Sequence, residues 1–527
     1  MPVDAVSLEV FKNLFISVAE EMGVTLTRTA YSPNIKERRD FSCALFDEEG
    51  RMVAQAAHIP VHLGSMPASV EAALARFQLA AGDVVILNDP YLGGTHLPDI
   101  TLVAPVFVGE GDDSVLAGFV ANRGHHADIG GMTPGSLPLS TELYQEGFII
   151  PPLKLAAAGV LNEEVVELLC RNSRTPHERR GDLSAQLGAI RTGELRLQEI
   201  VARYGLSTAR EHMEALMDYS ERLMRTSIEA IPDGTYSFRD YMDGDGLTDE
   251  PVVLAVSVTV AGDEATVDFT GTAEERPGCI NTPIAVVYSA ALYVLLCVAQ
   301  YSIPPNHGCM RPLRLVAPER SLVNPRPPHA VSGGNVETSQ RVVDVLFGAL
   351  AKALPGVVPA ASQGTMNNLL VGGHHPDHDA PYVYYETIAG GMGARPEKDG
   401  LDAVQTHMTN TMNTPVEALE FQFPLRVVRY AVRNGSGGGG QHRGGDGVVR
   451  EMEFLAPATV TIISERRRFQ PYGLQGGQPG QVGENVLVRM GVEEMRLGAK
   501  TTVEVQAGDV LRIATPGGGG WGQAHGH

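Results

Sequence analysis

Two short runs hold residue types and spacings that suit a divalent metal ion. In the first, NDPYLGGTHLPD, His96 and Asp99 stand three positions apart, and in the second, RGHHAD, His125 and His126 are adjacent. Imidazole and carboxylate groups are ligands that zinc and other transition metals accept. Each residue also has an ordinary structural use, as a strand-capping aspartate or a hydrogen-bonded buried histidine. The metal interpretation therefore depends on whether the fold brings the two runs together.

A β-hairpin predicted between the runs would do so. Residues 100–108 (ITLVAPVFV) and 115–122 (VLAGFVAN) have strand composition, and the polar, Gly-rich residues between them predict a turn. Paired positions in an antiparallel hairpin sum to a constant, so a turn centred near position 112 places Asp99 opposite His125. A slip of one residue would bring His126 to that face instead, so both histidines stay candidates.

Asp40 is a possible fourth ligand. It precedes a second predicted hairpin, formed by residues 41–46 and 51–55, and so stands at a strand entry as Asp99 does. Its alternative role is an ion pair with Arg38 or Arg39, which contributes little if it is exposed.

Three other residues are weaker candidates. His58 and His62 are four positions apart, but Pro60 between them prevents a shared helical face, so we expect them at most to line a pocket. Glu386, in the run YYET, is either a general acid or a hydrogen-bonded structural residue.

The remaining patterns predict an α+β fold: a multi-domain chain of mixed helices and strands with antiparallel β-hairpins, an αα-hairpin and a β-rich C-terminal region. We expect an N-terminal metal-binding α+β domain (1–232), a central α/β region that contacts substrate or partner (233–430) and a Gly-rich β region (431–527). The uncharged segment 284–303 lacks a basic flank and begins after Asn-Thr-Pro, which favours a buried helix over a membrane span. Other expected elements are helices at 7–26, 182–204, 207–231 and from Thr338 or Ser339 to 353, and strands at 83–87, within 235–271, at 459–463 and at 503–513.

The composition favours a cytoplasmic enzyme that acts on small molecules. The 527 residues carry 62 acidic and 41 basic side chains, a formal charge of −21, which disfavours nucleic acid and anionic membranes as partners. Five scattered cysteines without a CxxC pair fit a reducing compartment, and the N-terminus lacks a signal-peptide pattern. Residues 435–440 match GxGxxG but lie outside any βαβ unit, and no GxxxxGK[ST] is present, so we predict no nucleotide- or cofactor-binding residues.

Six runs together resemble the hydantoinase B family: NDPYLGGTHLPDI, RGHHADIGG, GNVETSQRVVD, YYETIAGG, NTPVEALE and TPGGGGWG. That family includes the B subunits of N-methylhydantoinases, the C-terminal half of 5-oxoprolinases, caprolactam lactamases and the metal-bearing subunits of acetone and acetophenone carboxylases. The resemblance covers essentially the whole chain and is far more specific to the family than to a substrate.

The resemblance implies a divalent metal (Zn, Mn or Fe) held by Asp40, His96, Asp99 and His125, with His126 as the alternative to His125. Independently of the resemblance, His126 is a candidate general acid. The resemblance also implies a hetero-oligomer with a hydantoinase A-type subunit, which binds ATP with Mg and phosphorylates the ring amide oxygen. A metal-bound hydroxide on this chain would then attack the activated carbon.

The leading hypothesis is therefore the metal-bearing subunit of an ATP-dependent hydrolase of cyclic amides, of the hydantoin or 5-oxoproline type. The alternative is the equivalent subunit of an ATP-dependent ketone carboxylase for acetone or acetophenone. A third hypothesis is a non-catalytic scaffold subunit with a structural metal, which a closed four-ligand shell would favour.

Overall fold

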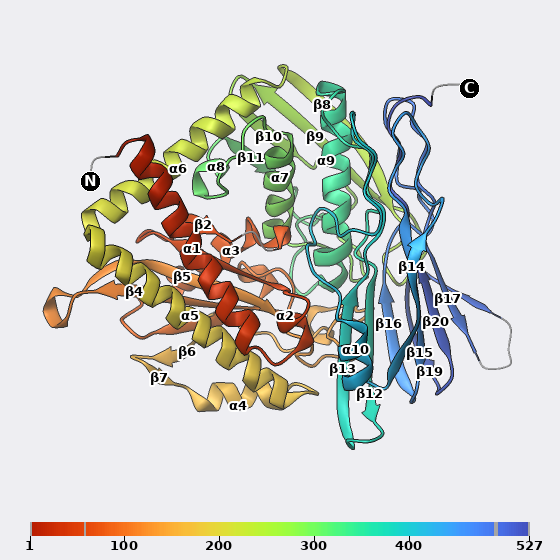
Figure 1. Cartoon of the computed structure of the whole chain (residues 1–527), viewed down its shortest axis with the longest axis horizontal. Helices are drawn as coiled ribbons and strands as arrows, with labels where there is room; N and C mark the ends of the chain where they lie inside the picture. Colours follow the sequence, from red (N-terminus) through yellow and green to blue (C-terminus); the bar gives the residue numbers. More distant parts are fainter. Residues whose placement is uncertain (1–2, 57–58, 490–493, 525–527) are drawn as a thin grey trace.

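The structure, a computed structural model, describes residues 3–56, 59–489 and 494–524. Helices make up 31% and strands 27% of it, arranged in four sheets in which only β10 and β11 pair in parallel among the described strands. The predicted α+β class is therefore confirmed. The N-terminal sheet and its helices lie at one side of the molecule and the C-terminal sheets at the other (Figure 1).

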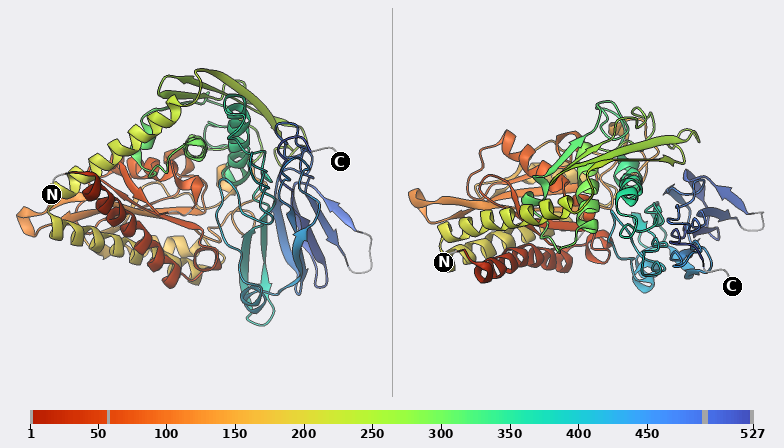
Figure 2. Two further views of the ribbon diagram at one scale, coloured as in Figure 1. Left: turned by 45° about the horizontal axis from the view of Figure 1, so that its top comes forward. Right: turned by 90° about the horizontal axis from the view of Figure 1, so that it is seen from above.

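The first sheet is buried on both faces. One face packs against α1 (Ala5–Thr29) and α5 (Pro176–Tyr204), which lie side by side along it (Figure 2), and the other packs against α3 (Ser65–Arg76). Side chains alternate between these two cores along each strand, so the strands show no polar face. In spatial order the strands are β2 (Met52–Gln55), β1 (Phe41–Phe46), β5 (Val115–His125), β4 (Asp99–Val108), β3 (Val84–Leu87), β6 (Leu153–Ala157) and β7 (Val160–Leu161).

Both predicted hairpins are present in this sheet. β4 pairs with β5 in the register that places Asp99 opposite His125, as expected. A bulge between Val106 and Phe107 adds one residue to β5, and without it Asp99 would face Gly124.

The second sheet, of strands β11-β10-β9-β8, encloses the central core together with α7 (Ile284–Val298) and α9 (Ser339–Ala353). No helix in the described part of the chain is both long and apolar enough to cross a membrane. The strands are β8 (Gly234–Met242), β9 (Val252–Ala261), β10 (Glu264–Asp268) and β11 (Leu313–Val316).

The predicted αα-hairpin is confirmed, but the expectation that it packs on the first sheet holds only in part. α6 (Leu206–Glu229) follows α5 after Gly205, whose φ of 87° turns the chain. Met213 packs in the core of the first sheet, whereas Met224 packs in the central core. α6 therefore spans two cores instead of packing only on the first sheet.

Two further sheets form the C-terminal side and pack face to face. The third sheet has the order β13-β12-β16-β19, with β13 (Ala380–Thr387), β12 (Asn368–His375), β16 (Ala458–Ile463) and β19 (Lys500–Val505). The fourth has the order β14-β15-β20-β17-β18, with β14 (Leu425–Arg433), β15 (Gly447–Phe454), β20 (Val510–Ala514), β17 (Glu484–Val488) and β18 (Met495–Leu497).

The segment 503–513, expected to be β structure, is divided between β19 and β20 in different sheets, because Gly508 turns the chain with a φ of 88°. The domain division stays a prediction. The expected limit at residue 430 lies inside β14, and the third sheet joins strands from both sides of it.

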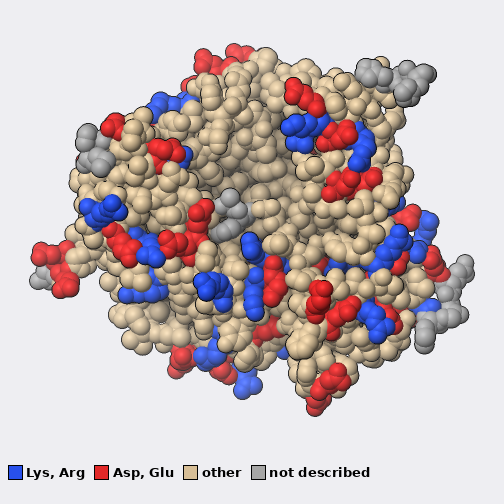
Figure 3. Space-filling view, in the orientation of Figure 1, with Lys and Arg blue, Asp and Glu red and all other residues tan. Residues whose placement is uncertain are grey.

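Remaining short helices complete the chain: α2 (Pro33–Lys36), α4 (Glu163–Arg171), α8 (His307–Met310) and α10 (Val416–Gln422). Acidic and basic side chains lie intermixed around an uncharged hollow on the face drawn in Figure 3. A cavity of about 780 Å³ opens between α3 and α7, and its lining includes Tyr288 and His307 but none of the predicted metal ligands.

Candidate metal centre

The base of the β4–β5 hairpin brings three predicted ligands together. Asp99 begins β4, His125 ends β5, and His96 lies in the preceding loop. One ligand atom from each residue lies within 4.8 Å of the others, and all three side chains are buried. The loop reaches this position because Gly93 has a φ of 86° and lies so close to the α3 backbone that a Cβ would meet the Ala68 carbonyl oxygen at 2.3 Å.

The donor atoms of this cluster fit a divalent cation. Among the residues that the structure describes, both ring nitrogens of His96, Oδ1 of Asp99 and Nε2 of His125 are buried and have no hydrogen-bond partner. Unpartnered buried polar atoms are costly, so several in one place point to a bound group. A cavity of about 20 Å³, large enough for one water molecule or metal ion, is lined in part by Asp99 and His125.

The carboxylate of Asp99 is held ionised. Its Oδ2 accepts a hydrogen bond from the Thr95 hydroxyl at 2.5 Å and lies 3.4 Å from His96 Nε2 and 3.5 Å from His62 Nε2. Burial opposes its ionisation, but the two histidines hold the pKa of Asp99 well below its usual range. His62, expected only to line a pocket, thus contacts a candidate ligand directly. His58 lies outside the described residues.

Asp40 lines the same cavity, although it is not one of the three closest residues. Its backbone carbonyl accepts a hydrogen bond from the His125 amide at 3.0 Å, which ties the entry of β1 to the end of β5. Burial raises the pKa of Asp40 to about 6, against the effect of Arg38, whose guanidinium lies 3.9 Å from the carboxylate. The ion pair considered from sequence is therefore with Arg38, and Arg39 is exposed.

His125 is fixed by residues that the sequence did not identify. Asn34 Nδ2 donates to His125 Nδ1 at 3.1 Å, and the Tyr385 ring stacks on the imidazole at 4.7 Å between centroids. Burial and the neighbouring His96 lower the pKa of His125 well below its usual range, which keeps the ring neutral as a ligand must be. The run of aromatic and β-branched residues from Tyr382 to Tyr385 was the available sequence signal for a strand there.

The two candidate general acids lie apart from the cluster. His126 hydrogen-bonds through Nε2 to Gln186 of α5 at 2.9 Å, and burial together with Arg179 lowers its pKa to about 4. Glu386 forms a buried ion pair with Arg450 at 2.9 Å and accepts a hydrogen bond from Asn413.

Comparison with known proteins agrees with this architecture. The family model described as hydantoinase B/oxoprolinase matches residues 4–524. The chain is 42% identical to 5-oxoprolinase 1 of Arabidopsis thaliana over 98% of its own length, but spans only 42% of that relative. It is 35% identical to the B component of a putative D-/L-hydantoinase from a Pseudomonas strain, with 99% of this chain and 90% of the relative covered.

A solved structure has the same fold. The crystal structure of ATP-dependent caprolactamase from Pseudomonas jessenii superposes with a TM-score of 0.92 at 30% identity, covering 99% of this chain and 92% of that one. The chain therefore belongs to the hydantoinase B/oxoprolinase family.

Proposed function

We propose that the chain is the metal-bearing subunit of an ATP-dependent hydrolase of cyclic amides. The observation that carries the proposal is the convergence of His96, Asp99 and His125, whose unpartnered donor atoms lie together in a chain of this family. The names 5-oxoprolinase and ATP-dependent caprolactamase, borne by similar proteins, support cyclic amides as the substrate class.

In this proposal, His96, Asp99 and His125, with Asp40 as a fourth donor, hold Zn, Mn or Fe. Such an ion supplies positive charge beside the reacting carbonyl and lowers the pKa of water. Thr95 orients the Asp99 carboxylate and Asn34 the His125 ring, the role that outer partners play around metal ligands.

The lining of the cavity also offers polar groups for a ring amide. Asn335, Thr409 and Thr411 line the cavity, and Oδ1 of Asn335 is buried with no hydrogen-bond partner in the described part of the chain. A cyclic amide presents an N–H donor beside its carbonyl, and we assign Asn335 Oδ1 as the acceptor for that N–H. Two flexible side chains in the wall, Met366 and Met408, can change rotamer to admit the ring.

Activation of the amide is assigned to a partner. A planar amide resists hydrolysis, and phosphorylation of its oxygen makes the carbon electrophilic and provides a leaving group. The sequence has no GxxxxGK[ST] motif, and a similar protein is named as one component of a hydantoinase, so we propose a hydantoinase A-type partner that binds ATP with Mg.

Co-expression with the product of the neighbouring gene tests the assignment. Purified complex is assayed for ATP hydrolysis stimulated by 5-oxoproline, hydantoins, caprolactam or acetone. Stimulation by a ring amide with release of the opened acid is expected. Stimulation by acetone alone, with fixation of carbon dioxide, would assign a carboxylase, and metal content without any stimulated activity would assign a scaffold subunit.

A further inference from the structure

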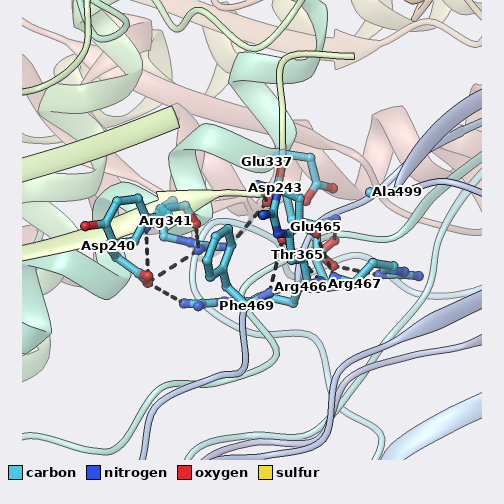
Figure 4. A network of polar contacts seen from close by, with 12 residues as sticks. Asp240, Asp243, Glu337, Arg341, Thr365, Glu465, Arg466, Arg467, Phe469 and Ala499 are labelled. Carbon is cyan, nitrogen blue, oxygen red and sulfur yellow. Dashed lines mark hydrogen bonds and ion pairs between the residues drawn. The ribbon is translucent and has the colours of Figure 1, made fainter. Parts of the chain in front are cut away.

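A second buried polar cluster lies where α9, the end of β8 and the segments before β12 and after β16 meet (Figure 4). It comprises five carboxyl groups and four cations: Asp240, Asp243, Glu337, Asp344, Glu465, Arg341, Arg466, Arg467 and Lys500. His407 also lies beside Asp344, but burial lowers its pKa and keeps it neutral. One carboxyl group is therefore in excess.

Four of the five carboxyl groups contact cationic side chains or backbone N–H donors, which stabilise an ionised carboxylate. Arg466 bridges Asp240 and Asp344 at 2.8 and 2.6 Å, and Lys500 hydrogen-bonds to Glu465. Asp243 accepts backbone N–H groups from residues 467–469, the closest at 2.7 Å.

Glu337 differs from the others. Its side chain is fully buried, and no cation lies within 4.0 Å of it among the residues that the structure describes. Oε1 accepts hydrogen bonds from Asn368 Nδ2 at 2.8 Å and from the Met366 amide at 3.1 Å, while Oε2 has no hydrogen-bond partner among the described residues. An unpaired buried carboxylate is far more costly than a neutral carboxylic acid.

We infer that Glu337 is a neutral carboxylic acid that carries the one extra proton of this cluster. We infer also that it positions the candidate metal centre through the residues that lie between them. The charged and titratable groups that face it are Glu465, Lys500, Arg467 and, through Asn368, Tyr385. Burial and the charge of Glu465 raise the pKa of Glu337 to about 8, in agreement with the geometry.

A short chain of contacts connects Glu337 to the candidate ligands. Asn368, held by Glu337, accepts the Tyr385 hydroxyl hydrogen bond at 2.9 Å, and the Tyr385 ring stacks on His125. Glu337 also belongs to the π-helical turn η5 (Gly334–Thr338), which places Asn335 in the metal cavity. π-Helical turns occur frequently at functional sites. Glu337 is thus a positioning residue, and this part of the inference rests on the proposed function.

The pH dependence of unfolding tests the protonation. Glutamate in an unfolded chain titrates near pH 4.3, so the stability due to the neutral form is fully present below that pH and is lost as pH rises to about 8. Glu337→Gln keeps a donor and an acceptor without the titration. As pH increases from 5 to 8, we expect the difference in unfolding temperature between Glu337→Gln and wild type to shift in favour of Glu337→Gln. In this pH range wild type should release about one more proton on unfolding than Glu337→Gln does.

Glu386→Gln is the matched control, because it removes a buried carboxylate outside the cluster and leaves Arg450 without its ion-pair partner, so it should lower the unfolding temperature between pH 5 and 8. Infrared spectra of the whole protein at pH 6 should show a stronger protonated carboxyl C=O stretch in wild type than in Glu337→Gln, whereas Glu386→Gln should keep the wild-type intensity. A constant temperature difference between Glu337→Gln and wild type, a band as strong in Glu337→Gln as in wild type, or a Glu337→Gln chain that does not fold at pH 6 would each overturn the inference.

Metal analysis separates the positioning role from the proposed function. Glu337→Gln should keep the wild-type metal content, whereas Glu337→Ala should lower it. Equal metal content in Glu337→Gln and Glu337→Ala would contradict the positioning role of Glu337. If wild type itself retains no metal, the proposed function fails, while the unfolding and infrared results still decide the protonation of Glu337.

Discussion

His125 and His126 are neighbours in the chain, but of the two only His125 belongs to the candidate metal cluster found among the described residues. His125 lies within the three-residue ligand set, whereas His126 contacts Gln186 under α5. We expect His125→Ala to lower bound metal by at least about tenfold, since loss of a ligand should cost at least as much as loss of its outer partner. His126→Ala should keep its metal and lose about 1–3 kcal/mol of stability, because Gln186 is left with a buried unpaired oxygen.

Metal analysis after gel filtration, with urea unfolding of both variants, checks this expectation. Comparable metal loss in the two variants would return His126 to the ligand set.

Arg38 joins the N-terminal sheet to β13. Its guanidinium donates to the Tyr385 carbonyl at 3.1 Å and the Thr387 hydroxyl at 2.9 Å, and it lies beside Asp40. Arg38→Met removes a buried cation and should lower the free energy of unfolding by about 3–5 kcal/mol. Arg39→Met, at an exposed neighbouring position, should change it by less than about 0.5 kcal/mol. Similar values from urea unfolding of the two variants would contradict the assignment.

At the scale of elements, the π-helical turn η5 depends on a glycine. A Cβ at Gly334 would lie 1.7 Å from the Asn281 carbonyl oxygen, whereas a Cβ at Gly356 would meet nothing within 4 Å. Gly334→Ala should therefore lower the free energy of unfolding by about 1–3 kcal/mol or more, because the backbone must shift. Calorimetry of both variants tests this, and a Gly334→Ala protein as stable as Gly356→Ala would show that the turn tolerates a side chain.

The elements also show how far the sequence could predict the site. Strand composition and the polar turn were sufficient for the β4–β5 hairpin, and counting from the turn placed Asp99 opposite His125. The bulge that sets this register adds a residue to β5 beside Gly118, and a glycine within a strand indicates a bulge without fixing the pairing on either side of it, so the choice between His125 and His126 stayed open. Asn34, His62 and Tyr385 approach from separate elements, and their positions follow from tertiary packing that local patterns do not encode.

At the scale of the whole molecule, bound metal should stabilise the fold. A ligand that binds only the folded chain adds about 2.7 kcal/mol when present at 100 times its Kd. Dialysis against a chelator should lower the unfolding temperature, and re-addition of Zn, Mn or Fe should restore it. The His96→Ala variant serves as the control and should respond to neither treatment. A chelator-treated wild type with an unchanged unfolding temperature would argue against a resident metal.

The contact between Tyr385 and His125 has a consequence for how the protein is made. Tyr385 is held in a sheet whose other strands include β16 and β19, which end at residue 505. At synthesis rates of about 5–20 residues per second, these strands leave the ribosome some 20–75 s after His125 does. During that interval the hairpin of β12 and β13 has a free edge, and the ligand set lacks one wall. The candidate metal centre would therefore be completed only after β16 and β19 have been synthesised, and loading with metal would report that these C-terminal strands have folded.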